Sequence, residues 1–310
     1  MSVPTLSQNT THPPLPPTSH TPPHLLHTPH HVRHDPQAFP THHDWQASAQ
    51  AKHRVVMAPL TRYRADDDHV HTDLGLEYYS QRASTPGTML ITEGTFISKR
   101  AGGDPHIPAL ETDAQLAAWK KITDAVHAKG SFIVAQLWAL GRQADPQFIA
   151  QEGYQYIGAS DIPLEGKNVS PWGFYGGMRM TDPKPQFSYI IQKIKENHPD
   201  LAYIHIVEPR ISGISDRVAY VDESNDFIRE IWAPRTLLSA GAYNRETGIK
   251  AAERGEIPVF GRCFISNPDL PVRLEKNIPL TPYDRSTFYA HNSPKGYIDY
   301  PFATTSSREH

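Results

Sequence analysis

The sequence predicts an incomplete α/β barrel of the eight-stranded TIM (β/α) type, with about six of the eight strand-and-helix units present. From Val55 onward, short apolar runs alternate with helical patterns, which is typical of buried parallel strands joined by helices. A barrel of this type closes with eight strands, but only six strand patterns can be counted. The missing units are expected in the irregular stretch over residues 140–186, because compact domains rarely contain structureless loops of that length.

Short apolar runs predict the strands, and apolar residues three and four positions apart predict the helices. The six strands are expected at residues 55–60, 88–92, 132–138, 202–207, 237–241 and 258–261. The helices are expected at residues 74–83, 113–127, around 189–194, and 245–254. Gly130 and Gly255 follow two of these helices, and glycine often ends a helix because it adopts the left-handed conformation without strain.

The first 50 residues differ from the rest of the chain, because Pro, His and Thr recur in them. Such a segment buries too little apolar surface to offset its ordering entropy, so it is expected to be disordered. It contains His-x-x-His pairs, His24 with His27 and His31 with His34, but its prolines prevent the helix that would align them for a metal. The predicted organisation is a tail over residues 1–50, a barrel over 51–302 and a short tail over 303–310.

Composition excludes some classes of partner. With a formal net charge of -3 over 310 residues, the chain has no basic surplus for a phosphate backbone, so no nucleic-acid partner is expected. No apolar run approaches the length needed to cross a bilayer, and no signal peptide is visible. A single cysteine, Cys263, cannot form an intramolecular disulfide and is expected to be a small buried residue. A cytoplasmic protein with a small-molecule substrate is therefore expected, and its oligomeric state stays open.

In parallel barrels, function lies at the C-terminal ends of the strands, and a phosphate commonly binds after the last two. Gly241 follows one late strand, and Gly261 with Arg262 follows the last. Glycine lets backbone N–H groups approach an anion, and an arginine fork matches phosphate oxygens. The alternative is a surface turn with a solvated arginine. Thr61 and Gln136 end two other strands, either facing the same mouth or bonded to nearby backbone.

The remaining candidates are weaker. The run Asp66–Asp68 followed by His69 offers oxygen and nitrogen ligands, but consecutive acids on a loop are usually solvated. The sequence contains no nucleotide-type glycine fingerprint, no P-loop and no nucleophile elbow. No metal site and no Ser, Cys or Lys nucleophile are therefore predicted.

Several longer segments together are specific to one family. They appear in the family's order at residues 53–62, 77–83, 91–94, 136–138, 260–270, 283–289 and 296–301. The first reads His-Arg-Val-Val-Met-Ala-Pro-Leu-Thr-Arg, and the fifth reads Phe-Gly-Arg-Cys-Phe-Ile-Ser-Asn-Pro-Asp-Leu. On these residues the chain resembles the Old Yellow Enzyme family of NADH:flavin oxidoreductases and NADPH dehydrogenases, which includes 12-oxophytodienoate reductase-like proteins.

The resemblance implies an FMN enzyme of the ene-reductase type. Such an enzyme takes hydride from NADPH or NADH and passes it to an activated C=C bond of an enone or nitroalkene. It also implies roles for particular residues: backbone groups of Pro59, Leu60 and Gly94 toward the flavin, Thr61 at the carbonyl next to N5, Gln136 at the pyrimidine edge, Gly241, Gly261 and Arg262 at the phosphate, and Trp138 and Tyr289 in the substrate pocket.

The chain also departs from the family pattern. The family's His-x-x-Asn or His-x-x-His pair, which donates hydrogen bonds to the substrate oxygen, is absent from the barrel, and so is the Tyr that follows it. Asn168 stands where a flavin-contacting Arg is expected, because the sequence passes from residues 160–166 directly to 170–172. The stretch before His53 is also unrelated to the family. No catalytic residue is assigned, and impaired activity is expected; the alternative is an inactive, degenerate flavoprotein or a misassembled gene product.

Overall fold

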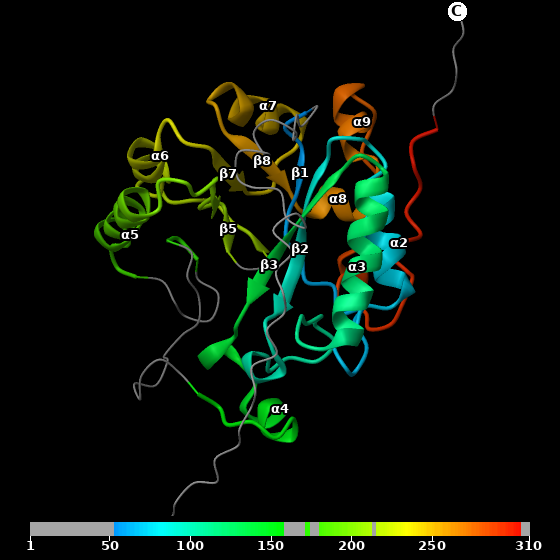
Figure 1. Ribbon diagram of the computed structural model, residues 1–310. Coiled ribbons are helices and arrows are strands. Elements are labelled where there is room, and N and C mark those ends of the chain that lie inside the picture. Colours follow the sequence, from blue (N-terminus) through cyan, green and yellow to red (C-terminus); the bar gives the residue numbers. More distant parts are fainter. Residues whose placement is uncertain (1–52, 158–170, 174–179, 213–214, 305–310) are drawn as a thin grey trace, which may run out of the picture. The chain divides into compact units, whose positions relative to one another are not determined.

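The computed structural model describes residues 53–157, 171–173, 180–212 and 215–304 (Figure 1). The predicted tail over residues 1–50, with its His-x-x-His pairs, lies outside these residues, and so do Asn168 and most of the short tail predicted after residue 302. None of the described helices is both long and apolar enough to cross a membrane.

Six parallel strands form the main sheet, in the order β3-β2-β1-β8-β7-β4. Their bounds are β1 Val56–Met57, β2 Met89–Phe96, β3 Phe132–Trp138, β4 Ile204–Val207, β7 Leu237–Ala240 and β8 Ile257–Phe260. The two strands that flank the long irregular stretch in sequence, β3 and β4, form the two edges of this sheet. The prediction of an incomplete barrel with six of its strands is thus confirmed, and the opening lies where the sequence predicts it.

All four predicted helices are present, as α2 Asp73–Arg82, α3 Asp113–Ala128, α5 Lys184–Asn197 and α7 Arg245–Glu253. The sequence patterns missed α4 Pro146–Gln151, α6 Asp226–Trp232, α8 Arg262–Ser266, α9 Leu270–Glu275 and the hairpin of β5 Ile211–Ser212 with β6 Ser215–Asp216. Within the described residues, 3-10 turns lie at Lys99–Ala101, Gly141–Gln143 and Arg285–Thr287. The stretch over 140–186 is therefore partly helical, because the Asp145 side chain caps α4 by accepting hydrogen bonds from two backbone N–H groups.

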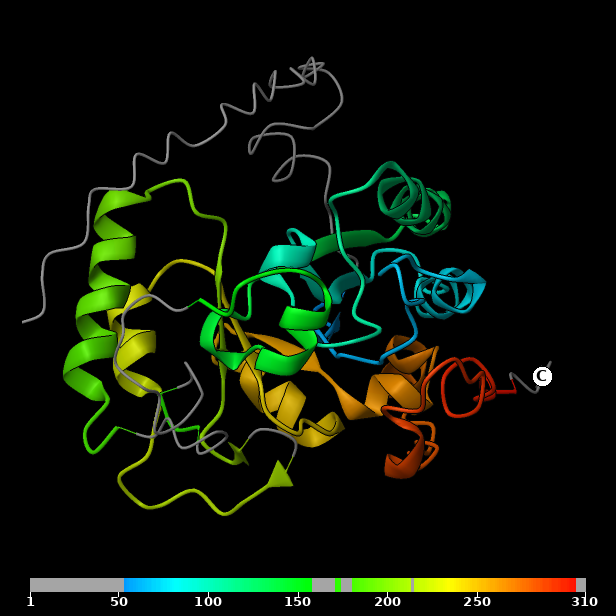
Figure 2. The same ribbon diagram turned by 90° about the horizontal axis from the view of Figure 1, so that it is seen from below.

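Alternate residues of the short strand β1 pack into two different apolar clusters. Met57 packs with the helices outside the sheet, in the cluster of Tyr78, Leu90 and Trp119. Val56 points to the inner side and packs with neighbours that include Val259. In Figures 1 and 2, α2 and α3 lie side by side over one part of the sheet, and α5 and α6 pair near β4 and β7.

Strand β3 does not share this burial. Every residue of β2 after Met89 is buried, whereas Ala135, Gln136 and Leu137 of β3 are exposed, Leu137 to 63%. The apolar run predicts a buried strand here, and that prediction is wrong. The reason is the missing neighbour, because β3 is an edge strand: α3 packs against it, but no strand of the described residues lies beyond it in the sheet.

Buried arginines hold the C-terminal segment, residues 285–296, against the end of β1. Arg62 and Arg64 have no exposed surface. Arg62 donates hydrogen bonds to the carbonyl oxygens of Phe288 and Gly296 at 3.1 and 2.8 Å, and Arg64 donates to Phe288 at 2.7 Å. Such charge-assisted bonds are stronger than neutral ones, so the position of this distant segment is fixed by the residues that follow β1.

Candidate functional site

The carboxyl ends of β1, β4, β7 and β8 open into one cavity of about 530 Å³. This is the end of a parallel sheet at which ligands bind in barrels and other α/β folds. Seven of the residues predicted from the sequence line this cavity: Pro59, Leu60, Thr61, Gly241, Gly261, Arg262 and Tyr289.

Arg262 points into the cavity as one half of a bidentate ion pair. Its Nη1 donates to Asp216 Oδ2 at 2.8 Å, and its Nη2 donates to the other oxygen of the same carboxylate. Tyr283 supplies a further contact, with its hydroxyl 3.3 Å from Nη1. The hydrogen bond from Arg262 holds the pKa of Asp216 below its usual range. The Asp216 carboxylate thus occupies the face of the guanidinium that would receive an anionic ligand.

The chain can turn after β7 only because residue 241 is glycine. A Cβ atom added to Gly241 would lie 2.5 Å from Cβ of Glu208, which is closer than packed atoms approach. The carbonyl oxygen of Gly241 accepts a hydrogen bond from Nε of Arg210, so this turn is also held by the turn that follows β4. Gly261 is less crowded, since its nearest neighbour would be Cδ2 of Leu60 at 3.4 Å.

The residues after β1 border the cavity, and hydrogen bonds fix the backbone at both ends of this segment. Ala58 N–H donates to the carbonyl of Phe260 at 2.9 Å, and Arg62 N–H donates to Glu93 Oε2 at 3.1 Å. Pro59, Leu60 and Thr61 lie between these two anchors and are half-buried, so their backbone and the Thr61 hydroxyl border the cavity at positions set by both ends.

Gly94, Gln136 and Trp138 are not brought to this cavity, although Gly94 and Gln136 are register partners on β2 and β3. The Trp138 ring covers Gly94, because a Cβ atom there would lie 2.5 Å from Trp138 Cε3. The Gln136 backbone N–H donates to Thr92 Oγ1 at 2.9 Å, and the residue is exposed. The predicted site residues are therefore divided between this cavity and strands β2 and β3.

Sequence reasoning missed several polar residues of the cavity, and His205 and Asp216 are two of them. His205 on β4 lines it, and burial lowers the pKa of this histidine to about 4, so its ring is neutral. Its Nε2 is buried and makes no hydrogen bond. The signal was a single polar residue between the apolar residues of a strand. Asp216 gave no signal, because its hairpin reaches Arg262 from 46 positions away.

Comparison with known families matches most of the chain. The sequence profile described as "NADH:flavin oxidoreductase / NADH oxidase family" matches residues 47–170 and 168–281. The two matched segments meet near residue 169, within the stretch between β3 and β4 where barrel units are missing.

Individual relatives match over more positions than this chain supplies. "Chanoclavine-I aldehyde reductase fgaOx3" from Penicillium roqueforti is 38% identical over 345 residues, covering 81% of this chain and 92% of the relative. Since 81% of 310 residues is about 251, roughly 94 of those 345 positions have no counterpart here. "Probable inactive reductase easA" from Epichloe festucae var. lolii is 29% identical, covering 81% of this chain and 92% of that protein.

Solved structures agree with the fold. The Old Yellow Enzyme from Pichia sp. AKU4542 superposes with a TM-score of 0.69 at 27% identity, covering 82% of this chain and 90% of that one. Morphinone reductase superposes with a TM-score of 0.67 at 25% identity, covering 82% and 93%. The chain therefore belongs to the NADH:flavin oxidoreductase / NADH oxidase family, and its fold is an incomplete form of the Old Yellow Enzyme barrel.

Proposed function

We propose that this chain binds FMN and acts as an NAD(P)H oxidoreductase of the ene-reductase type, with impaired turnover on activated C=C bonds of enones or nitroalkenes. The observation that supports it is the guanidinium of Arg262, presented to a cavity at the ends of β7 and β8. The ends of these two late strands are where barrels commonly bind a phosphate, and the family resemblance implies the FMN phosphate at the same place.

The donor set fits the phosphate end of FMN. Arg262 already holds a carboxylate in a bidentate arrangement, and phosphate oxygens suit the same fork. The neutral ring of His205 adds a buried nitrogen without a partner, which a polar ligand would satisfy. Gly241, Gly261 and Arg262 would hold the phosphate, and Pro59, Leu60 and Thr61 would border the ring system. When bound, FMN supplies the hydride chemistry between nicotinamide and alkene.

The flavin ring and the substrate would find less support than the phosphate. Gly94, Gln136 and Trp138 lie outside the cavity lining, so the pyrimidine edge and one wall of the substrate site are not formed around it. Tyr289 lines the cavity but is 46% exposed. Losing one preorganised oxyanion donor costs about a hundredfold or more in rate, and the sequence lacks the family's pair. We expect turnover well below the usual range of about 1 to 1,000 per second.

A second candidate is a flavoprotein without catalytic activity. The similarity to "Probable inactive reductase easA" favours it, and so does the exposure of Gln136 on the open edge of β3. The two candidates share the flavin site and differ only in turnover.

Flavin titration followed by turnover assays tests both candidates. The full chain is titrated with FMN and the quenching of flavin fluorescence is followed, beside Arg262→Met and beside Arg100→Met, an exposed arginine outside the cavity lining. We expect saturable binding that is weakened at least about tenfold in Arg262→Met only, in line with the strength of a charge-assisted bidentate pair. Equal binding by all three proteins, or no binding, would contradict the proposed flavin site.

NADPH and NADH consumption is then measured with a cyclic enone, a nitroalkene and an unsaturated aldehyde, the last because one relative is named an aldehyde reductase. Slow, substrate-dependent consumption above that of free FMN supports the ene-reductase. Saturable FMN binding with no such consumption favours the inactive flavoprotein.

A further inference from the structure

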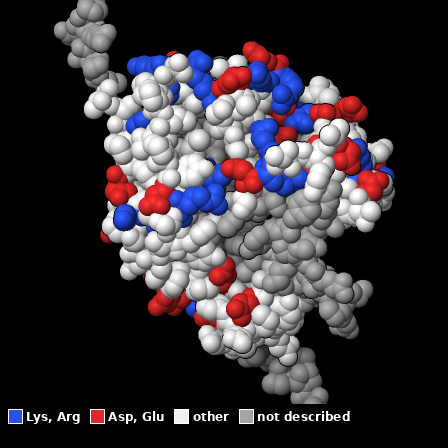
Figure 3. Space-filling model, turned by 180° about the vertical axis from the view of Figure 1, so that it is seen from behind, with Lys and Arg blue, Asp and Glu red and all other residues white. Residues whose placement is uncertain are grey.

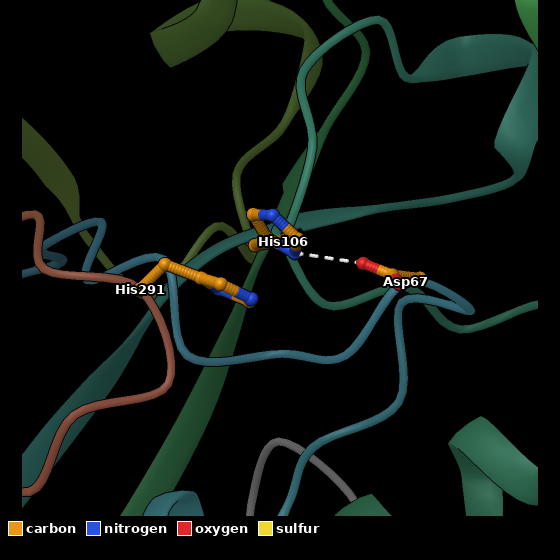
Figure 4. A group of neighbouring side chains, drawn as sticks. All are labelled: Asp67, His106 and His291. Atoms are coloured by element: carbon orange, nitrogen blue, oxygen red, sulfur yellow. Dashed lines mark ion pairs between the residues drawn. The ribbon is translucent and has the colours of Figure 1, made fainter.

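Three potential metal ligands from three distant parts of the chain meet beside the C-terminal segment (Figure 4). Asp67 lies in the loop after β1, His106 lies between β2 and α3, and His291 follows the 3-10 turn Arg285–Thr287. One ligand atom from each residue lies within 4.8 Å of the other two. The sequence predicts no metal site, because these residues are separated by 39 and 185 positions.

The two histidine rings lie unusually close for solvated side chains. Their centroids are 3.3 Å apart, and the ring planes are inclined by 23°. His106 Nδ1 lies 3.4 Å from Asp67 Oδ1, yet it is buried and makes no hydrogen bond. A buried ring nitrogen without a partner is costly, and a cation placed between it and the carboxylate would satisfy both.

The surroundings orient His291 as a ligand. Its Nδ1 lies 3.4 Å from the carbonyl oxygen of Tyr63, and the Tyr63 hydroxyl in turn donates to Asp104 Oδ2 at 2.6 Å. A histidine that donates one ring N–H to a backbone carbonyl presents the lone pair of its other nitrogen, which is the usual second-shell arrangement at metal sites.

Asp66 and His69, which lie near Asp67 in the sequence, already make other hydrogen bonds. Asp66 Oδ1 accepts hydrogen bonds from the N–H groups of Asp68 and Val70, so it closes the turn of its own loop. His69 is buried, with Nδ1 2.6 Å from the carbonyl of Ile107. Within this acidic run, Asp67 is the residue whose side chain, 93% exposed, reaches the two histidines.

We propose that Asp67, His106 and His291 form a three-ligand site for a first-row divalent cation such as Zn²⁺. Two imidazoles and one carboxylate suit such ions and not Mg²⁺ or Ca²⁺, which prefer oxygen. With zinc bonds of about 2.0–2.2 Å, tetrahedral ligands lie about 3.3 Å apart, so the three ligand atoms have to approach one another, and one of the stacked rings has to turn so that both ring nitrogens point at the ion. Asp67 and His291 are exposed and His106 is half-buried, which leaves room for this movement. A fourth position is left for water.

The bound ion ties the two loops to the segment that carries Tyr289. This tyrosine stands two residues before His291, lines the cavity and packs edge-on against Tyr63, with ring centroids 5.7 Å apart. The cation therefore stiffens one rim of the cavity. The site itself contains none of the proposed flavin ligands, so it stands whether or not FMN binds.

Zinc binding by the full chain tests this site. The wild type is freed of metal with a chelator and compared with His106→Ala/His291→Ala and with the matched control His127→Ala/His198→Ala, which removes two exposed histidines outside the site. The histidines before residue 53 are common to all three proteins, so their binding cancels in the comparison. We expect the wild type and control to retain one more equivalent of Zn²⁺ in equilibrium dialysis, and Zn²⁺ to raise the Tm of these two proteins only.

The Asp67→Asn variant keeps both histidines. It therefore tests the site even if the double variant fails to fold. We expect it to fold and to bind Zn²⁺ at least about tenfold more weakly, since even second-shell changes cost that much. Equal zinc content and an equal Tm increase in the wild type and Asp67→Asn would overturn the proposal. So would equality of the wild type and the double variant.

Discussion

The two sides of this incomplete sheet differ in how deeply their residues are buried. The side formed by β1, β7 and β8 is buried and encloses a cavity with a paired arginine. The β3 side, only two strands away, exposes Gln136 and Leu137. The residues predicted to hold the flavin phosphate line the cavity, whereas Gln136, predicted at the pyrimidine edge, is exposed on β3.

Charged side chains of both signs are mixed on the face of the molecule that Figure 3 shows. Seen from behind, Lys and Arg side chains alternate with Asp and Glu over the described surface, without a large region of one sign (Figure 3). Beside β4, the partly buried Arg229 pairs with Glu208, Glu256 and Asp226.

Matched leucine truncations on neighbouring strands test the contrast in burial between the two sides of the sheet most strongly. Leu90 on β2 has no exposed surface, and Leu137 on β3 is 63% exposed. We expect Leu90→Ala to lower the free energy of unfolding by about 2–5 kcal/mol, because it leaves a cavity in the core, and Leu137→Ala to change it by less than about 0.5 kcal/mol. Urea unfolding measures both; an equally large loss for Leu137→Ala would mean that β3 is covered in solution.

The buried carboxyl of Glu93, on β2, should make the free energy of unfolding depend on pH. Burial raises the pKa of Glu93 from 4.5 to about 7. The folded state therefore keeps this proton up to about pH 7, whereas the unfolded chain releases it near pH 4.5. The stabilisation is complete below about pH 4.5 and is lost as the pH rises through about 7.

Glu93→Gln removes this titration and can still accept the hydrogen bond from the Arg62 N–H, which Glu93 Oε2 accepts in the wild type. Between about pH 4.5 and 7, we expect the stability of Glu93→Gln to rise relative to the wild type by roughly 3 kcal/mol, from about 1.4 kcal/mol per pKa unit. Unfolding by urea at several pH values measures this difference. A constant difference across that range would show that Glu93 is ionised in the folded protein.

Much of this contrast was visible in the sequence, and part of it was not. The six strands follow from local apolar runs, and the opening between β3 and β4 follows from the count of strands and the gap in family segments. The exposure of Leu137 does not follow from the apolar run of β3 itself, because it depends on a neighbouring strand that the described part of the chain lacks. The Asp216 contact with Arg262 could not be predicted either, since it depends on a short hairpin whose own sequence carries no apolar pattern.

In the cavity, the carboxylate of Asp216 competes with any anion for Arg262. Asp216→Asn keeps the size of the side chain and removes its charge, so the guanidinium becomes available. We expect FMN and inorganic phosphate to bind about tenfold more tightly, equivalent to about 1.4 kcal/mol at 25 °C, as measured by fluorescence quenching and by competition with phosphate. Unchanged affinity for both ligands would show that Asp216 leaves the arginine without cost when the anion binds.

The smallest effect is expected on the open side, at Gln136. Its side chain is predicted from the family resemblance to hold the pyrimidine edge, but the residue lies at an exposed edge outside the cavity lining. If the ring end of the site has lost its wall, then Gln136→Ala should change FMN affinity by less than about threefold, below 0.7 kcal/mol. A loss of tenfold or more in the same fluorescence titration would mean that bound flavin draws β3 back to the cavity. The two sides of the sheet would then differ only until the ligand binds.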